Sequence, residues 1–257
     1  KVYEARAKQG GKTVLVVSVP YQELASQWVI NLRDFNIFPV KCWDSRIKWE
    51  EELKNSIIKF NLEAIDFLSI VVVNRTMESD FFKKILLPLK ESDLMVIGDE
   101  CHNHGSKKTN DSIPLAHFRM GLSATPFRSD DDEIDNPFPD LAKDRILSYY
   151  KGIVAKYSLG DAINDGVLCE YEYQIIPVYL TEDEQEKYEN LSSEIGRLIG
   201  SGQTAQSSGQ LTALCGQRSR LLGGAQGKLP ALASLLKRLD GGKKGSLFYC
   251  GEGKSFD

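Results

Sequence analysis

"MVIGDECHNHG", residues 95–105, joins an apolar run directly to two neighbouring acids, a cysteine and a histidine. The run is apolar at successive positions, which is typical of a strand buried on both faces of a parallel sheet. In open α/β sheets, ligands bind in the crevice at the carboxyl ends of the strands. The stretch therefore predicts that Asp99 and Glu100 lie at the rim of a sheet, with a ligand pocket beside them.

Similar apolar runs recur along the first half of the chain, with helical periodicity between them. They are "TVLVVSV" (13–19), "LSIVVV" (68–73), "DLMVIG" (93–98) and "FRMGLSA" (118–124). Between the first two, an apolar residue recurs every three or four positions, as on a helix that lies against a sheet. These residues are Leu24, Trp28, Leu32 and Phe35. We therefore expect an α/β fold with right-handed βαβ crossovers.

The pattern changes after residue 126. "RSDDDEIDNPFPD" (128–140) is acidic and has no periodicity, so it predicts a loop. From Tyr157 a second section begins, with a short helix that we expect to be capped near Ser158 and to end at Gly166.

Five further elements are expected in this second section. They are an extended strand over "YEYQIIPVYL" (171–180), a capping box of Thr181 and Glu184 that opens a helix, a flexible linker or hairpin tip over "GSGQTAQSSGQ" (200–210), an amphipathic helix over 228–239, and a buried strand over "GSLFYCG" (245–251).

Composition limits the classes of protein to consider. The 257 residues include 32 basic and 36 acidic side chains, a net charge of −4, so contact with nucleic acid would have to be local. The five cysteines are scattered and form no CxxC pair, which argues against a disulfide framework or a zinc ribbon. No apolar run approaches the roughly 18 residues that cross a bilayer. We expect a soluble protein in the reducing cytoplasm.

The two acids suit phosphate chemistry. An apolar strand followed by Asp is the Walker B arrangement, in which the carboxylate binds the Mg²⁺ that bridges nucleotide phosphates. Mg²⁺ keeps several water ligands, so one well-placed carboxylate suffices. The neighbouring Glu100 can orient and deprotonate the water that attacks the γ-phosphate.

Four stretches resemble the motifs of superfamily 2 helicases and translocases of the DExH class. "DECH" (99–102) resembles motif II and "GLSATP" (121–126) resembles motif III. Upstream, "VVSVPYQELASQW" (16–28) is similar to motif Ia, and "VVVNRTMESDFF" (71–82) lies in the position of the motif Ib region. All four occur in family order. A wider similarity past residue 126 points to bacterial helicases of the restriction and DNA-defence type.

The resemblance implies a fold class and a division of the chain. It implies a RecA-like parallel sheet flanked by helices as the first helicase lobe, then a connecting segment and the start of a second RecA-like lobe. The corresponding bounds are 1–156 for the first ATPase domain, 157–227 for the connecting strand and helices, and 228–257 for the truncated second domain. The implied function is ATP-dependent movement on nucleic acid, more often DNA than RNA, with ATP and Mg²⁺ as cofactors.

The resemblance also implies residue roles. Asp99 would be the metal ligand and Glu100 the general base, while His102 would link them to the hydroxyls of Ser123 and Thr125 or to the second lobe. The residues that would line the nucleic-acid track are Pro20, Tyr21, Gln27, Asn74 and Thr76. Backbone N–H groups and hydroxyls can bind phosphates without net positive charge, so an acidic chain can have such a partner.

One part of the family pattern is missing from the sequence. A Walker A loop needs GxxxxGK[ST], but "RAKQGGKT" (6–13) has Arg6 in place of the first glycine and precedes a strand. We interpret Gly10 and Gly11 as the end of a helix and a turn. Family order would place motif I before Lys1 and motifs V and VI after Asp257, so we expect this chain alone not to hydrolyse ATP.

Several alternatives remain open at the level of sequence. The chain could belong to the motor subunit of a restriction or repair complex, to a non-hydrolysing helicase-like scaffold, or to a nuclease that holds metal on Asp99 and Glu100. Cys101, His102 and His104 could bind zinc. Trp28 and Trp43 fit the core better than a base-stacking role, and the basic residues within 216–244 fit a solvated helix face or a nucleic-acid contact.

Overall fold

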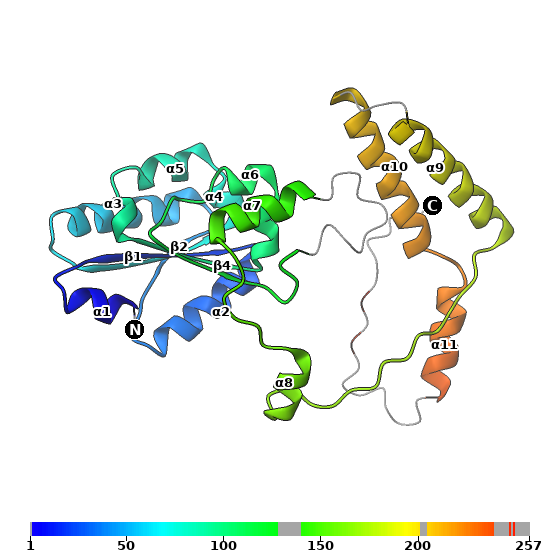
Figure 1. The fold of residues 1–257 in the computed structure, drawn as a ribbon, viewed down its shortest axis with the longest axis horizontal. Coiled ribbons are helices and arrows are strands. Elements are labelled where there is room, and N and C mark those ends of the chain that lie inside the picture. The colour runs from blue at the N-terminus through cyan, green and yellow to red at the C-terminus, as the bar shows by residue number, and fades with distance from the viewer. Residues whose placement is uncertain (1, 128–139, 201–204, 239–246, 248, 250–257) are drawn as a thin grey trace. The chain divides into compact units, whose positions relative to one another are not determined.

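The computed structural model describes residues 2–127, 140–200, 205–238, 247 and 249 (Figure 1). The chain divides into two compact units, residues 1–156 and residues 157–257. Among the described helices, none combines the length and the apolar character that a membrane span requires.

The first unit is built on one five-stranded sheet in which every neighbouring pair is parallel. The strands are β1 (Thr13–Val19), β2 (Val40–Cys42), β3 (Phe67–Val73), β4 (Leu94–Asp99) and β5 (Phe118–Leu122), in the order β2-β3-β1-β4-β5. The expected parallel α/β fold is confirmed. Four of the strands were predicted from their apolar runs; β2 was missed because its three residues are too few for a periodic pattern.

Helices cover both faces of this sheet (Figure 1). The helices α1 (Val2–Ala7) and α2 (Gln22–Arg33) lie on one face. The opposite face carries α3 (Arg46–Asn61), α4 (Asn74–Met77), α5 (Asp80–Leu86), α6 (Lys107–Asn110) and α7 (Asp140–Tyr150). Two short 3₁₀ helices, η1 (Glu91–Asp93) and η2 (Cys101–Gly105), flank β4.

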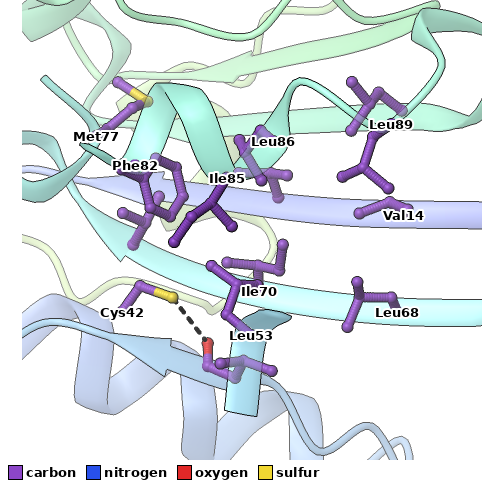
Figure 2. Close-up of a cluster of buried hydrophobic side chains, with 14 of the residues drawn as sticks. Val14, Cys42, Leu53, Leu68, Ile70, Met77, Phe82, Ile85, Leu86 and Leu89 are labelled. Atoms are coloured by element: carbon purple, nitrogen blue, oxygen red, sulfur yellow. Dashed lines mark hydrogen bonds between the residues drawn. The ribbon is translucent and has the colours of Figure 1, made fainter. Parts of the chain in front are cut away.

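Two apolar clusters fill the space between the sheet and its helices. Val14 and Val16 of β1 point into the cluster under α3 and α5, whereas Leu15 and Val17 point into the cluster under α2. Figure 2 shows the first cluster, with Leu53 of α3 and Ile85 and Leu86 of α5 around Val14, Leu68 and Ile70. Since strand side chains alternate between faces, burial on both faces explains why β1 is apolar at every position except Thr13 and Ser18.

The buried face of α2 differs from the expected apolar face at its C-terminal end. Ala25, Val29 and Leu32 are buried, and Leu24 and Trp28 are half-buried against the same cluster. Phe35 is 76% exposed because the helix ends at Arg33 and the chain then turns at Asn36, which has a positive φ of 57°.

Helix starts in the second unit follow the expected caps. In α8 (Leu159–Asn164), Ser158 and Asp161 form a reciprocal capping box, and Gly166 follows the helix with a φ of +68°. In α9 (Glu182–Gly200), the Thr181 N–H donates to Glu184 Oε2 at 2.9 Å and the Glu184 N–H donates to Thr181 Oγ1 at 3.4 Å. The predicted helix at 228–239 is α11 (Lys228–Arg238).

Two expectations for the second unit are wrong. Residues 171–180 form no strand, and half or more of the side chain surface of Tyr171, Tyr173 and Tyr179 is exposed. The expected linker at 200–210 is helical from residue 205, where α10 (Ala205–Gly223) begins. Leu211 and Leu214 of α10 pack with Ile195 of α9, so tertiary packing outweighs the Gly/Ser/Gln composition of the segment.

Two other expectations fall outside the described residues. The loop predicted at 128–140 is described only at residue 140, and the strand predicted at 245–251 is described only at residues 247 and 249. The start of a second RecA-like lobe therefore stays a prediction.

Adjacent isoleucines on α3 provide a test of how this helix packs. Ile57 is 3% exposed and Ile58 is 54% exposed. We expect Ile57→Ala to lower the free energy of unfolding by roughly 2–5 kcal/mol, since it removes buried methyl groups and leaves a cavity. Ile58→Ala should change it by less than about 0.5 kcal/mol. Urea unfolding followed by circular dichroism measures both, and equal losses would contradict the packing of α3.

Candidate functional site

Parallel pairing brings the two sequence motifs to one rim of the sheet. Gly98 of β4 lies opposite Gly121 of β5, and Asp99 lies opposite Leu122, so DECH and SAT follow at neighbouring strand ends. Gly98 has no room for a side chain, because a Cβ there would overlap the Tyr150 hydroxyl and the His104 ring.

The turn after β4 passes through Glu100 in the left-handed region, with φ 48° and ψ 50°. This conformation costs a residue with a side chain about 1 kcal/mol, and such residues concentrate at functional sites. It ends the strand and starts η2 within one residue, which keeps Asp99 and His102 close to the same rim.

Asp99 is held by two hydrogen bonds from different elements. Its Oδ1 accepts from the Glu100 N–H at 2.9 Å, and its Oδ2 accepts from the Trp28 indole N–H of α2 at 2.7 Å. A carboxylate has about four lone-pair directions, so about two stay available. The group therefore fits a Mg²⁺ ion that takes one protein carboxylate and completes its shell with water and phosphate oxygens.

His102 lies between the general-base candidate and the SAT segment. Its Nδ1 is 3.3 Å from Glu100 Oε2 and 3.2 Å from Ser123 Oγ, and its Nε2 is 3.2 Å from Asn103 Nδ2. Thr125 is exposed, and its backbone N–H donates to Ser123 Oγ at 3.1 Å. The structure therefore brings Glu100, His102 and Ser123 together, whereas Thr125 joins them through its backbone.

A second histidine of the same segment, His104, is completely buried and contacts two more elements directly and a third through Ser18. Its Nε2 is 3.3 Å from Ser18 Oγ of β1, and its Nδ1 is 2.7 Å from the Tyr150 hydroxyl of α7. Ser18 donates its only proton to Asn74 Oδ1 at 2.7 Å. Ser18 must then accept from His104 Nε2–H, which leaves Nδ1 to accept from Tyr150.

The environment of His104 keeps this ring neutral. Burial lowers its pKa from the usual 6.5 to about 4, and the nearby His102 adds to the effect. A second ring proton on Nδ1 would force the Tyr150 hydroxyl to give up its present role as donor, and it would bury a positive charge.

A cavity of about 690 Å³ opens at the carboxyl ends of the strands. The residues that line it are Pro20, Asn74, Glu78, His102, Asn103, Gly105, Ser106, Thr109, Leu141, Ala142 and Arg145. Asp99 and Glu100 are absent from this lining, which contains His102 and Asn103 of the same segment. The reason is strand alternation: Asp99 follows Met95 and Ile97 toward the α2 face, and the cavity is lined from α4, α6 and α7.

The five residues predicted to contact nucleic acid separate into two groups. Pro20 and Asn74 line the cavity. Tyr21 precedes the first turn of α2 and is 55% exposed, and Gln27 is exposed on the same helix. Thr76 is half-buried in α4, where its carbonyl accepts from Ser79 Oγ at 2.7 Å.

Charged residues at the cavity were not found from the sequence. Arg145 donates to the Gly105 carbonyl at 2.9 Å. Glu78 accepts from Thr109 Oγ1 at 2.7 Å and lies 2.8 Å from Lys108 Nζ. Burial opposes ionisation of Glu78, but the Lys108 and Thr109 contacts outweigh it and hold its pKa below the usual value. No local pattern marks Arg145, because it reaches the site only through the packing of α7 on η2.

The zinc alternative has no support among the described residues, where no cluster of three His, Cys, Asp or Glu side chains could hold a metal. Burial raises the pKa of the Cys101 thiol to about 11, and the Glu100 and Asp99 carboxylates add to this. His104 is engaged with Ser18 and Tyr150. Without a bound metal, Cys101 is therefore a protonated side chain that packs in the interior.

Comparison with protein families bears on the type of domain. Residues 1–128, just under half of the chain, match the family model "Type III restriction enzyme, res subunit". This match supports a domain of the superfamily 2 helicase type. Among solved structures, the chain is similar to the Hef helicase domain of Pyrococcus furiosus, with 16% identity over 84% of this chain and a TM-score of 0.41. This chain spans 45% of that structure. No curated protein matches this chain.

The buried neutral state of His104 predicts a loss of stability in acid. Between pH 6.5 and about pH 4 the unfolded chain binds a proton on this residue that the folded chain does not. The free energy of unfolding should therefore fall as pH falls through this window, by up to about 3 kcal/mol. His104→Gln should show a weaker pH dependence there, measured by urea unfolding at several pH values. The control His117→Gln, at an exposed position, should keep the wild-type dependence, and identical profiles for all three proteins would contradict the assignment.

Proposed function

We propose that this chain belongs to an ATP-dependent nucleic-acid motor, a helicase or translocase that acts on DNA more than on RNA. The observation that carries the proposal is the position of His102, which lies within 3.3 Å of both Glu100 Oε2 and Ser123 Oγ. A motor needs a side chain that contacts the residues around the γ-phosphate and also contacts a segment that moves when the phosphate is released. His102 has this position between DECH and SAT.

In the proposed reaction, Asp99 would hold Mg²⁺, and Glu100 would orient and deprotonate the attacking water. By holding the ion, Asp99 would supply neutralisation of the charge that develops on the phosphate groups. The Glu100 carboxylate, with 39% of its side chain exposed, can accept a proton from a water molecule that lies in line with the γ-phosphate. His102 keeps this carboxylate oriented, and its contact with Ser123 passes a change in Glu100 to the SAT segment.

The cavity is the proposed contact for the nucleic-acid backbone, together with Tyr21, Gln27 and Thr76 around it. Pro20 and Asn74 border it, and Arg145 supplies a cation that has no carboxylate partner among the residues the structure describes. Glu78 is neutralised by Lys108. Among the described lining residues, Arg145 is therefore the cation that suits a phosphodiester group.

The remaining machinery would come from outside residues 1–257. The sequence has no GxxxxGK[ST] segment, so we propose that the phosphate-binding loop and the arginine finger are supplied by other parts of the same protein or by a partner subunit. The family match to a restriction res subunit favours a motor subunit of a restriction complex as the second candidate.

Glu100→Gln tests the assignment of the general base in the full-length protein that contains this sequence. We expect nucleic-acid-stimulated ATP hydrolysis to fall by about 100-fold or more, since the amide cannot accept the proton of water. Glu63→Gln is the matched control, because Glu63 is also a left-handed glutamate, with φ 61°, but lies on the exposed surface.

Three results would each contradict one part of the proposal. Full activity of Glu100→Gln would remove Glu100 from the reaction. A wild-type protein that binds nucleic acid without hydrolysing ATP would favour the scaffold. Cleavage of nucleic acid that needs metal but no ATP, and that Asp99→Ala abolishes, would favour the nuclease.

Arg145→Gln tests whether this side chain binds a phosphate group. Removing one cation that binds a phosphate should reduce the slope of log affinity against log salt by about 0.7 to 0.9, because fewer counterions are released on binding. Titrations of labelled DNA at several salt concentrations measure this slope. Arg145→Lys should keep most of the slope, and Lys143→Gln, on the same helix but outside the cavity lining, should leave it unchanged. An unchanged slope in Arg145→Gln would show that Arg145 does not bind the nucleic-acid backbone.

A further inference from the structure

The hydrogen bond between Trp28 and Asp99 joins two parts of the chain that the sequence separates by 71 residues. Trp28 lies on α2, and its indole N–H reaches the carboxylate at the end of β4 over 2.7 Å. The other carboxylate oxygen accepts from the Glu100 N–H at 2.9 Å. Two donors on different elements therefore fix both the position and the plane of the carboxylate.

The core holds the Trp28 donor in place. The indole ring is half-buried and packs against the apolar cluster that contains Val17 and Val29. A donor on a mobile surface side chain would lose rotamer entropy each time it formed this bond. The packed indole has already lost that freedom on folding, so it can orient Asp99 at little further cost.

We propose that Trp28 is a positioning residue that sets the Asp99 carboxylate for Mg²⁺ binding. The inference rests on the proposed function, in which Asp99 is the metal ligand. Mg²⁺ demands near-ideal octahedral geometry, so the direction of a single protein carboxylate strongly affects its affinity. Removing a hydrogen-bond partner of a metal ligand typically costs 10- to 100-fold in metal affinity or activity.

A purely packing role for Trp28 predicts a different result. In that case the hydrogen bond only satisfies the indole N–H, and its removal lowers stability without affecting the metal. Trp43 supplies the matched control, since it packs against the same cluster and makes no hydrogen bond to Asp99. Replacing either residue with Phe removes an indole N–H and keeps an aromatic ring.

The test measures the Mg²⁺ dependence of nucleotide binding in the full-length protein. A fluorescent N-methylanthraniloyl derivative of ADP is titrated at a series of Mg²⁺ concentrations, with no hydrolysis involved. Trp28→Phe should raise the Mg²⁺ concentration at half-maximal binding by about tenfold or more. Trp43→Phe should leave it within about twofold of wild type, and thermal melting of both variants reports how far each substitution weakens the packing.

Each other outcome overturns the proposal in an identifiable way. If the wild-type protein needs Mg²⁺ for nucleotide binding and Trp28→Phe has the same Mg²⁺ concentration at half-maximal binding, the proposed role of Trp28 is wrong. The proposed function is unaffected by that result. Equal shifts in Trp28→Phe and Trp43→Phe would assign the effect to general loosening of the cluster. A wild-type protein that needs no Mg²⁺ for nucleotide binding would remove Asp99 as a metal ligand, and the proposed function would fail with it.

Discussion

The parallel pairing of β1 with β3 on one side and β4 on the other brings the polar segments that follow these three strands to one rim. Ser18 is opposite both Val72 and Gly98, so β1, β3 and β4 end within a residue or two of one another. Parallel strands can be paired in this register only if the helices between them pack on the two faces. The apolar side chains of β1 are therefore what brings the following polar segments to one rim.

Close packing then restricts what the segment after β4 can do. Gly98 lets the His104 ring and the Tyr150 hydroxyl lie directly against the strand, and the left-handed Glu100 turns the chain sharply into η2. Both features cost conformational freedom or strain, and the hydrogen bonds of His104 to Ser18 and Tyr150 offset that cost. A rigid turn of this kind keeps Asp99 and His102 in a constant relation to each other.

The sequence predicts the parts of this fold that depend on local pattern. Four strands follow from apolar runs, and the starts of α8 and α9 follow from their capping residues, because these signals act between residues close along the chain. The Trp28 contact with Asp99 and the place of Arg145 at the cavity have no such signal, since each depends on how a helix packs on the sheet. The helix of α10 was missed for the same reason, because leucines on its partner-facing side decide it.

The two histidines of η2 connect opposite sides of the rim. His102 contacts Glu100 and Ser123, while His104, two residues later, contacts Ser18, whose hydroxyl bonds to Asn74 at the cavity. His104 and Asn74 are therefore connected through Ser18 by contacts of 3.3 and 2.7 Å. The helix α2 forms a second connection, because it follows the exposed Tyr21 and carries the exposed Gln27 as well as the indole bound to Asp99. In the proposed motor, hydrolysis and strand contact must exchange free energy, and η2 and α2 are the elements that connect the two proposed sites.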